Sequence, residues 1–334
     1  MATVLLAGTG AVGIRAARQL VDTVAVDALL IAGGNSSQVD DLADALGDQA
    51  RAVTLRADEP LPEGVDVVAA ALPADAAVTL ARRALDAGIP FASTLDDGHA
   101  IDALLEIDHE ARRAGILVAP GCGLAPGLSD VLARHASDAL DSVDEIQVAR
   151  SGVAGHACVA AARRARRDPA VEWRDGEWHE DKRATGELVW FPDPVGPREC
   201  AAVADGIALL VRAFPSVRRA TVRLGDPPPR RMTWPGRRGA DDGWGAARVE
   251  VWGWRGSARE SMVYGVIDRT AVAAGTVLAV ASARLAGIAK GLEARGGATA
   301  GVHSLAALVE PVPFLADLAR RGVKAAVFEG VRVA

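Results

Sequence analysis

The sequence predicts an α/β fold in which a doubly wound parallel sheet is joined to a second, mixed α/β domain. The chain opens on an apolar strand, a glycine-rich turn and an amphipathic helix. Short apolar strands then alternate with helical segments up to residue 119, which is typical of a parallel sheet covered by helices. All seven tryptophans lie in the second half of the chain, and this change of composition indicates a domain boundary. We expect a first domain over residues 1–134 and a second over 135–334, whose C-terminal helices pack back on the first.

The opening turn has the residue pattern of a dinucleotide-binding site. After a buried strand at residues 4–7 comes Gly8-Thr9-Gly10-Ala11-Val12-Gly13, and apolar residues then recur at helical spacing up to Leu20. In a G-x-G-x-x-G turn, the first glycine permits the tight turn and the second lets the backbone approach a pyrophosphate. The third lets the helix pack closely on the strand, and the helix N-terminus offers N–H groups to phosphate. The sequence thus predicts that all six residues bind a dinucleotide in a Rossmann domain.

The rest of the first domain continues the same alternation. Strands are expected at 28–32, 53–55, 65–70, 89–93 and 116–119. Helices are expected after the turn at 33–37 as far as Leu46, and at 76–87, 101–114 and 131–136. The glycine- and proline-rich turn before the last helix, with Pro126 near the helix start, directs a further helix N-terminus to the same edge. Ligands bind at the carboxyl ends of parallel strands. The residues predicted to bind cofactor there are Gly34, Asn35, Ser36, Asp58, Ala71, Leu72, Pro73, Thr94 and Gly123.

The end of the second strand bears on the choice between NAD and NADP. An acidic residue there would bind the ribose 2′-hydroxyl and repel a 2′-phosphate, but the chain has Gly33-Gly34. Asn35 and Ser36 can donate hydrogen bonds to a phosphate, although no arginine stands beside them. This pattern favours NADP without excluding NAD. The alternative is that Asn35 and Ser36 only turn the chain and cap the next helix.

Composition restricts the partners and the compartment. The net charge of −6 argues against nucleic acid. Cys122, Cys158 and Cys200 have no metal-like spacing, so we expect free thiols, a cytoplasmic protein and no metal site. The N-terminus has no signal peptide pattern. The apolar run 271–289 contains Arg284, which favours a buried helix over a membrane span.

The second domain is expected to contain a sheet. Strands are predicted at 145–150, 187–191, 220–224, 248–254 and 262–267. The arginines at 163–167 are interpreted as a solvated helix face. The long segment 226–245, rich in Pro, Gly and Arg, is interpreted as either a lid or a surface insertion.

Several motifs together identify a family resemblance. GTGAVG at 8–13, AALP at 70–73 and PGCGLAPGLSDVLA at 120–133 resemble the saccharopine dehydrogenase-like oxidoreductases, and CGLAPG resembles the lysine 6-dehydrogenase branch in particular. The resemblance implies a Rossmann domain, a mixed α/β second domain and a nicotinamide cofactor. It also implies action on amines or amino acids through an imine. Members that use NAD carry an acidic residue where this chain has Gly33-Gly34.

The predicted function is therefore a nicotinamide-dependent oxidation of a C–N bond in a small amine or amino acid, by a homodimer. A carbonyl or alkene reductase and a non-catalytic cofactor sensor remain alternatives. Three residues are candidates for the chemistry. Asp97 lies on the loop after the fifth strand but is also placed to cap the next helix. His156 lies at a helix start in the second domain, and Cys122 lies in the glycine-rich turn, where close packing is the competing interpretation.

Overall fold

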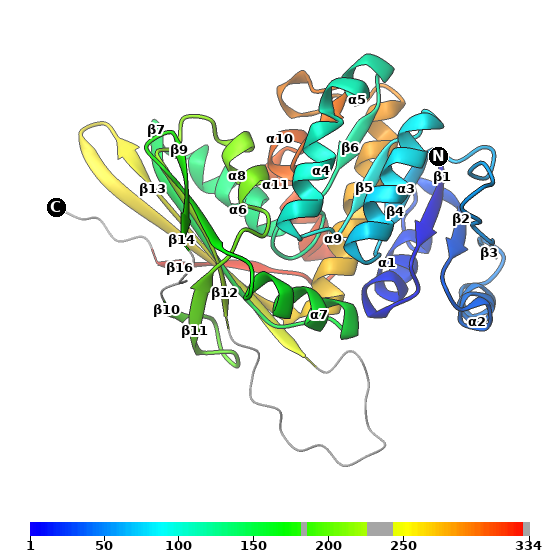
Figure 1. Ribbon diagram of the computed structural model, residues 1–334, viewed down its shortest axis with the longest axis horizontal. Helices are drawn as coiled ribbons and strands as arrows, with labels where there is room; N and C mark the ends of the chain where they lie inside the picture. The colour runs from blue at the N-terminus through cyan, green and yellow to red at the C-terminus, as the bar shows by residue number, and fades with distance from the viewer. Residues whose placement is uncertain (182–185, 226–242, 330–334) are drawn as a thin grey trace, which may run out of the picture.

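The computed structural model describes residues 1–181, 186–225 and 243–329 and arranges them around two β-sheets (Figure 1). One sheet carries the N-terminus and has helices on both faces. The other lies beside it and has helices on the face toward the first sheet.

The first sheet has seven parallel strands in the order β15-β6-β5-β4-β1-β2-β3. The order of β3 to β6 is the 3-2-1-4-5-6 order of a Rossmann sheet, with β15 added beside β6. The predicted α/β fold is therefore confirmed. The strands are β1 (Ala2–Ala7), β2 (Val26–Ala32), β3 (Ala50–Ala52), β4 (Val67–Ala70), β5 (Phe91–Ser93), β6 (Leu117–Ala119) and β15 (Gly301–Val302).

The third strand lies earlier than predicted, at Ala50–Ala52 rather than at 53–55. β3 is the edge strand and pairs with β2 from Leu29↔Ala50 onward. The last bond of this pairing runs from the N–H of Val53 to the carbonyl of Ile31, at 2.8 Å. Because β2 itself ends at Ala32, Leu55 packs against the core without a strand partner among the described residues.

The helices around this sheet are α1 (Ala11–Val21), α2 (Ser36–Leu46), α3 (Ala74–Asp86), α4 (Gly98–Glu106) and α5 (Asp108–Ala114). The prediction of a single helix over 101–114 is wrong, because the chain turns at the buried residue Ile107 and forms two helices. This break lets the carboxylate of Asp108 accept the N–H of Val302 in β15, at 2.7 Å. The chain here satisfies a backbone group of the seventh strand instead of continuing one helix.

The apolar run of the second half forms α9 (Thr270–Ala289), as predicted. The helix is long and apolar enough to cross a membrane, but most of it is buried against α1, β4 and β5. Gly275 lies where α9 meets α1, and a Cβ there would come within 2.6 Å of the Cβ of Arg15. A glycine is therefore required for this close approach, and α9 is a core helix.

The second sheet is mixed, because β12 and β7 are parallel and the other pairs are antiparallel. The path β10-β11-β12-β7-β13-β14-β16 is extended by β8 and β9 beside β12. The predicted segment 226–245 falls almost entirely outside the described residues. The strands are β7 (Ser142–Ser151), β8 (Ala170–Arg174), β9 (Glu177–Asp181), β10 (Gly186–Trp190), β11 (Pro197–Ala202), β12 (Arg219–Gly225), β13 (Trp244–Arg255), β14 (Ala258–Arg269) and β16 (Ala325–Glu329).

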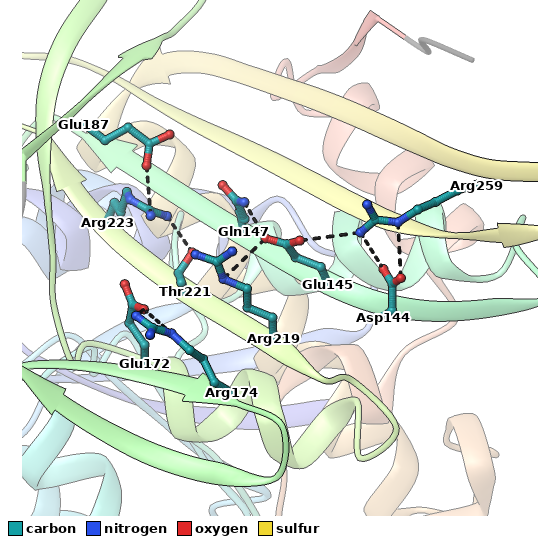
Figure 2. A network of polar contacts seen from close by, with 10 residues as sticks. All are labelled: Asp144, Glu145, Gln147, Glu172, Arg174, Glu187, Arg219, Thr221, Arg223 and Arg259. Atoms are coloured by element: carbon teal, nitrogen blue, oxygen red, sulfur yellow. Dashed lines mark hydrogen bonds and ion pairs between the residues drawn. The ribbon is translucent and has the colours of Figure 1, made fainter. Parts of the chain in front are cut away.

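A network of ion pairs covers the outer face of this sheet (Figure 2). Glu145 and Gln147 of β7 point outward, where Glu145 lies 3.6 Å from Arg219 and accepts a hydrogen bond from Gln147 at 2.7 Å. Side chains alternate between the two faces of a strand. Ile146 and Val148 therefore point inward, and so does Arg150, which lies on the same face as these core residues.

The inner face of the second sheet shares a hydrophobic core with the first sheet. One cluster joins Leu6 and Leu20 of the Rossmann side to Ile146 and Val249 of the second sheet. The domain boundary at residue 134 stays a prediction. The remaining helices are α6 (Leu128–Ser137), α7 (His156–Ala165), α8 (Ile207–Ala213), α10 (Leu305–Leu308), α11 (Pro311–Arg320) and the short 3-10 turn η1 (Arg295–Gly297).

Candidate active site

The glycine turn between β1 and α1 has no room for side chains at its first and third glycines. Gly8 has a φ of 108°, and a Cβ there would lie 2.3 Å from the carbonyl oxygen of Ala71. A Cβ at Gly13 would lie 1.8 Å from the carbonyl oxygen of Gly8. These two glycines therefore hold α1 tightly against the ends of β1 and β4.

Gly10, the second glycine, has a different environment. It is exposed, and a Cβ there would meet none of the described residues within 4 Å. Gly10 is also the N-cap of α1, and none of the side chains that the structure describes caps this helix. By contrast, α2 is capped by Asn35, whose Oδ1 accepts the N–H of Gln38 at 3.4 Å. The first N–H groups of α1 thus face an open space, and this cradle fits a diphosphate.

The end of β2 carries no carboxylate, and its geometry explains the glycine there. A Cβ at Gly33 would lie 2.7 Å from the Oγ1 of Thr9, which in turn donates to the Oε1 of Gln38 at 3.3 Å. Gly34, Asn35 and Ser36 are exposed. The interpretation of Asn35 as a helix cap is confirmed. That Asn35 also donates a hydrogen bond to a 2′-phosphate of the cofactor stays a prediction. Asp58 is exposed and does not line the cavity described next.

A cavity of ≈ 260 Å³ lies where the carboxyl ends of β4, β5 and β6 face the end of β7. Its walls include the starts of α1 and α9 and one side of α7 along most of its length. Five residues predicted to bind cofactor line it: Val12, Leu72, Pro73, Thr94 and Gly123. The position agrees with the rule that ligands bind outside the carboxyl ends of parallel strands.

Charged side chains gather at one side of this cavity. One terminal nitrogen of Arg150, Nη2, lies 2.6 Å from Asp205 and 3.0 Å from Asp96. Asp97 lies 3.5 Å from the Nε of Arg164, which comes from α7. Arg150 and Asp205 are largely shielded from solvent, with 14% and 7% of their side chains exposed. We refer to these five residues as the carboxylate–guanidinium cluster.

Close backbone packing brings Asp205 into the cluster. A Cβ at Gly206 would lie 2.9 Å from the ring of Pro126, so the loop before α8 rests directly on the turn before α6. A Cβ at Gly98 would lie 3.1 Å from the Cβ of Ala204, which holds the Asp97 loop against the same segment. Helix α6 itself begins at Leu128, three residues before the predicted start, because Gly127 with a φ of 120° is its N-cap.

Burial and neighbouring charges shift the pKa values of Asp205 and Arg150. Burial raises the pKa of Asp205 to about 7, since desolvation outweighs the favourable charge of Arg150, and the charge of Asp96 raises it further. Burial alone would lower the pKa of Arg150, but the charges of Asp96 and Asp205 reverse the effect and raise it. The guanidinium of Arg150 therefore stays charged, and the carboxyl group of Asp205 can hold a proton near neutral pH.

Of the three residues predicted to be catalytic, the structure brings only Asp97 to the cavity. Its Oδ1 also accepts the N–H of Ala100 at 3.0 Å, so the capping role is confirmed. His156 is the first residue of α7 and is exposed, whereas Ala157 and Cys158 line the cavity. Cys122 is fully buried outside the cavity wall, and burial raises the pKa of its thiol far above the ordinary range. Close packing is the role that this position supports.

Sequence reasoning missed Arg150 and Asp205 and did not foresee the ion pair of Arg164 with Asp97. A signal existed for Arg150, because an arginine that alternates with Ile146 and Val148 occupies a core-facing position. Asp205 precedes Gly206 at the start of an apolar helical run, which identifies a helix start but no partner. Arg163, Arg164 and Arg167 are exposed as predicted, although Arg164 also pairs with Asp97. Arg166 differs, because it is half-buried and donates a hydrogen bond to the carbonyl oxygen of Gly225 at 2.5 Å. The interpretation of the run as a solvated face is therefore confirmed for three of its four arginines.

Comparison with known proteins supports the fold. No protein-family model matches the chain. The structure is similar to that of apo saccharopine dehydrogenase (L-Glu forming) from Saccharomyces cerevisiae, with a TM-score of 0.69, 15% sequence identity and 100% coverage of both chains. It is also similar to DAP dehydrogenase from C. glutamicum in complex with DAP, with a TM-score of 0.53, 14% identity and coverage of 96% and 98%. The resemblance to saccharopine dehydrogenase-like proteins is thus confirmed at the level of the fold.

Proposed function

We propose that the protein is a nicotinamide-dependent dehydrogenase that oxidises a C–N bond of a small amine or amino acid. The observation that carries this proposal is the carboxylate–guanidinium cluster. Four of its residues line the same cavity as the residues that follow β4, β5 and β6 in the Rossmann sheet, and the fifth, Asp205, pairs with Arg150. A carboxylate-rich site attracts an ammonium group and can accept its proton. The similar fold of saccharopine dehydrogenase and DAP dehydrogenase adds support.

The cofactor is NADP or NAD, with NADP favoured by the absence of a carboxylate at the end of β2. The turn from Gly8 to Gly13 and the N-terminus of α1 would hold its diphosphate. Leu72, Pro73 and Thr94, at the ends of β4 and β5, would contact its nicotinamide end. When bound, the cofactor accepts a hydride from the substrate carbon.

The protein's own residues would bind the amine and remove its proton. Asp96 and Asp97 line the cavity and face an incoming ammonium group. Asp96 and Asp205 both pair with Arg150. Burial raises the pKa of Asp205 to about 7. Asp205 would therefore take up one proton near neutral pH when the ammonium group loses it.

We also propose that the protein works in the cytoplasm as a homodimer. Its three cysteines are free thiols, as expected in a reducing compartment. Trp178, Trp190 and Trp254 of the second sheet are exposed, and large exposed aromatic side chains favour a protein interface. Light scattering of the purified chain should give twice the monomer mass.

The function is tested by measuring cofactor binding and then cofactor reduction with a panel of amines and amino acids. We expect saturable binding of NADP or NAD and reduction by at least one amine. Because the proton acceptor must be deprotonated, kcat/KM should rise as the pH increases through about 7. In Asp205→Asn this rise should disappear or move. Tight cofactor binding without turnover of any amine would contradict the proposal and favour a sensor, whereas turnover of ketones alone would favour a carbonyl reductase.

A further inference from the structure

We infer that helix α7 is a lid that must swing outward before a ligand can enter or leave the cavity. The inference goes beyond the proposed function, because it concerns access to the cavity and holds for any ligand that binds there. It starts from the place of α7 in the fold. The helix follows β7 of the second sheet, and its residues Ala157, Cys158 and Ala161 line the cavity. α7 therefore forms one wall of a site whose other walls come from both sheets.

α7 itself is loosely packed. Ala165, at its C-terminal end, is the one residue of this helix that is buried. Ala157 and Ala160 line the cavity and are nevertheless exposed. Alanine side chains are small, and hydrophobic stabilisation is roughly proportional to the apolar area that is buried. Little stabilisation would therefore be lost if the N-terminal part of α7 moved outward.

The two ends of α7 are held differently. At the C-terminal end, Ala165 belongs to the main hydrophobic cluster, and Arg166 donates a hydrogen bond to the carbonyl oxygen of Gly225 at 2.5 Å. At the N-terminal end, a Cβ at Gly155 would lie 3.8 Å from the Cβ of Ala11, which is an ordinary van der Waals contact with the start of α1 (Figure 1). The C-terminal end is therefore the fixed end, and the N-terminal end is the one that moves.

The size of the cavity also calls for a movement. At ≈ 260 Å³ the cavity lies below the usual range for ligand pockets, which begins at about 300 Å³. Under the proposed function, it must admit the nicotinamide end of the cofactor and a substrate together. Leu124 and Ala125 of the cavity wall belong to the main hydrophobic cluster and cannot withdraw without opening the core. α7 is the wall that can yield.

The thiol of Cys158 reports on the position of α7. Cys158 lines the cavity and is half-buried, whereas Cys122 and Cys200 are fully buried. Burial raises the pKa of the Cys158 thiol, and the charge of Asp96 raises it further. Because the thiolate is the form that reacts, alkylation of Cys158 should be slow while α7 covers the cavity. It should be faster when α7 has swung outward.

A disulfide between α7 and α1 would lock the lid. The separation of 3.8 Å between the Cβ positions of residues 155 and 11 matches the mean of about 3.8 Å found in disulfides. Gly155 has a φ of 169°, which is extended backbone that any residue adopts. The test uses the full-length double variant Ala11→Cys/Gly155→Cys after oxidation. Its control is Ala11→Ser/Gly155→Ser, which fills the same two positions without a bridge.

The rate of alkylation of Cys158 by iodoacetamide at about pH 8.5 is measured by peptide mass spectrometry. We expect alkylation to be about tenfold or more slower in the bridged protein than in the serine control, because the bridge removes a sparsely populated open state. Reduction of the bridge should restore the rate. Equal rates in the bridged protein and the control, or failure of the bridge to form on oxidation, would overturn the inference.

This measurement needs no cofactor, so it separates the lid from the proposed function. If the bridge protects Cys158 but neither NADPH nor NADH binds to the original protein, the lid stands and the proposed function is wrong. If an amine reduces the cofactor while Cys158 reacts equally fast in both variants, the dehydrogenase stands and the lid is wrong.

Discussion

The substitution Gly13→Ala is expected to lower the free energy of unfolding by about 3 kcal/mol or more. The added Cβ would lie 1.8 Å from the carbonyl oxygen of Gly8 and 2.8 Å from its carbonyl carbon. These are backbone atoms of a turn that is itself packed on Ala71, so neither the turn nor the helix can move away at a small energetic cost. Helix α1 would have to move away from β1, and α9 with it. Urea unfolding followed by circular dichroism measures the loss.

A matched substitution in the same turn serves as the control. Gly10→Ala adds the same methyl group where none of the described residues lies within 4 Å, and Gly10 has a φ of −74° that alanine readily adopts. Its unfolding free energy should stay within about 0.5 kcal/mol of the original protein. If Gly13→Ala were as stable as Gly10→Ala, the close packing of α1 on β1 described here would be wrong.

Arg150→Met is expected to destabilise the protein by about 3–5 kcal/mol above neutral pH. The substitution keeps a long side chain but leaves the buried carboxylate of Asp205 without its partner at 2.6 Å. Arg163→Met, the same exchange at an exposed position of α7, should have little effect. Equal losses in both variants would contradict the structural role of the pair.

The loss in Arg150→Met should depend on pH in a defined direction. The pKa of Asp205 in the folded protein is about 7, above its ordinary value of 3.8. The folded protein thus holds this proton more tightly than the unfolded chain, so the stability from this group falls as the pH rises from about 4 to about 7. Burial raises the pKa of Asp130 to about 7 as well, so two protons contribute to the change of the unfolding free energy with pH. Without Arg150, Asp205 should be more stable protonated, and the destabilisation should be smaller at about pH 5 than at about pH 8.

Much of the fold was predictable because local patterns agreed with the tertiary structure. The turn from Gly8 to Gly13 and the apolar helix 271–289 both lie where the sequence predicts them. The failures occur where tertiary contacts decide. The edge strand β3 is placed by its pairing with β2, and the turn at Ile107 depends on a bond between Asp108 and β15, nearly two hundred residues away. The hairpin of β8 and β9 was missed although Asp175-Gly176 is a known turn pair.

The site was less predictable than the fold. Asp97 was found because it follows a strand of the Rossmann sheet. Arg150 and Asp205 lie 55 residues apart in the chain and meet in the folded structure, where Gly206 packs directly on Pro126. No local pattern carries this information. His156 and Cys122 were chosen for their chemical type, but the first is exposed, the second is fully buried, and neither lines the cavity.

The central claim is that the open space at Gly10 receives the diphosphate of a nicotinamide dinucleotide. Fluorescence titration of NADPH and NADH into the original protein and Gly10→Ala tests it most directly. The methyl group would occupy the space in front of the α1 N-terminus, so the dissociation constant should rise about tenfold while the free protein stays equally stable. Equal affinity of the two proteins, or no saturable binding to the original protein, would contradict the claim.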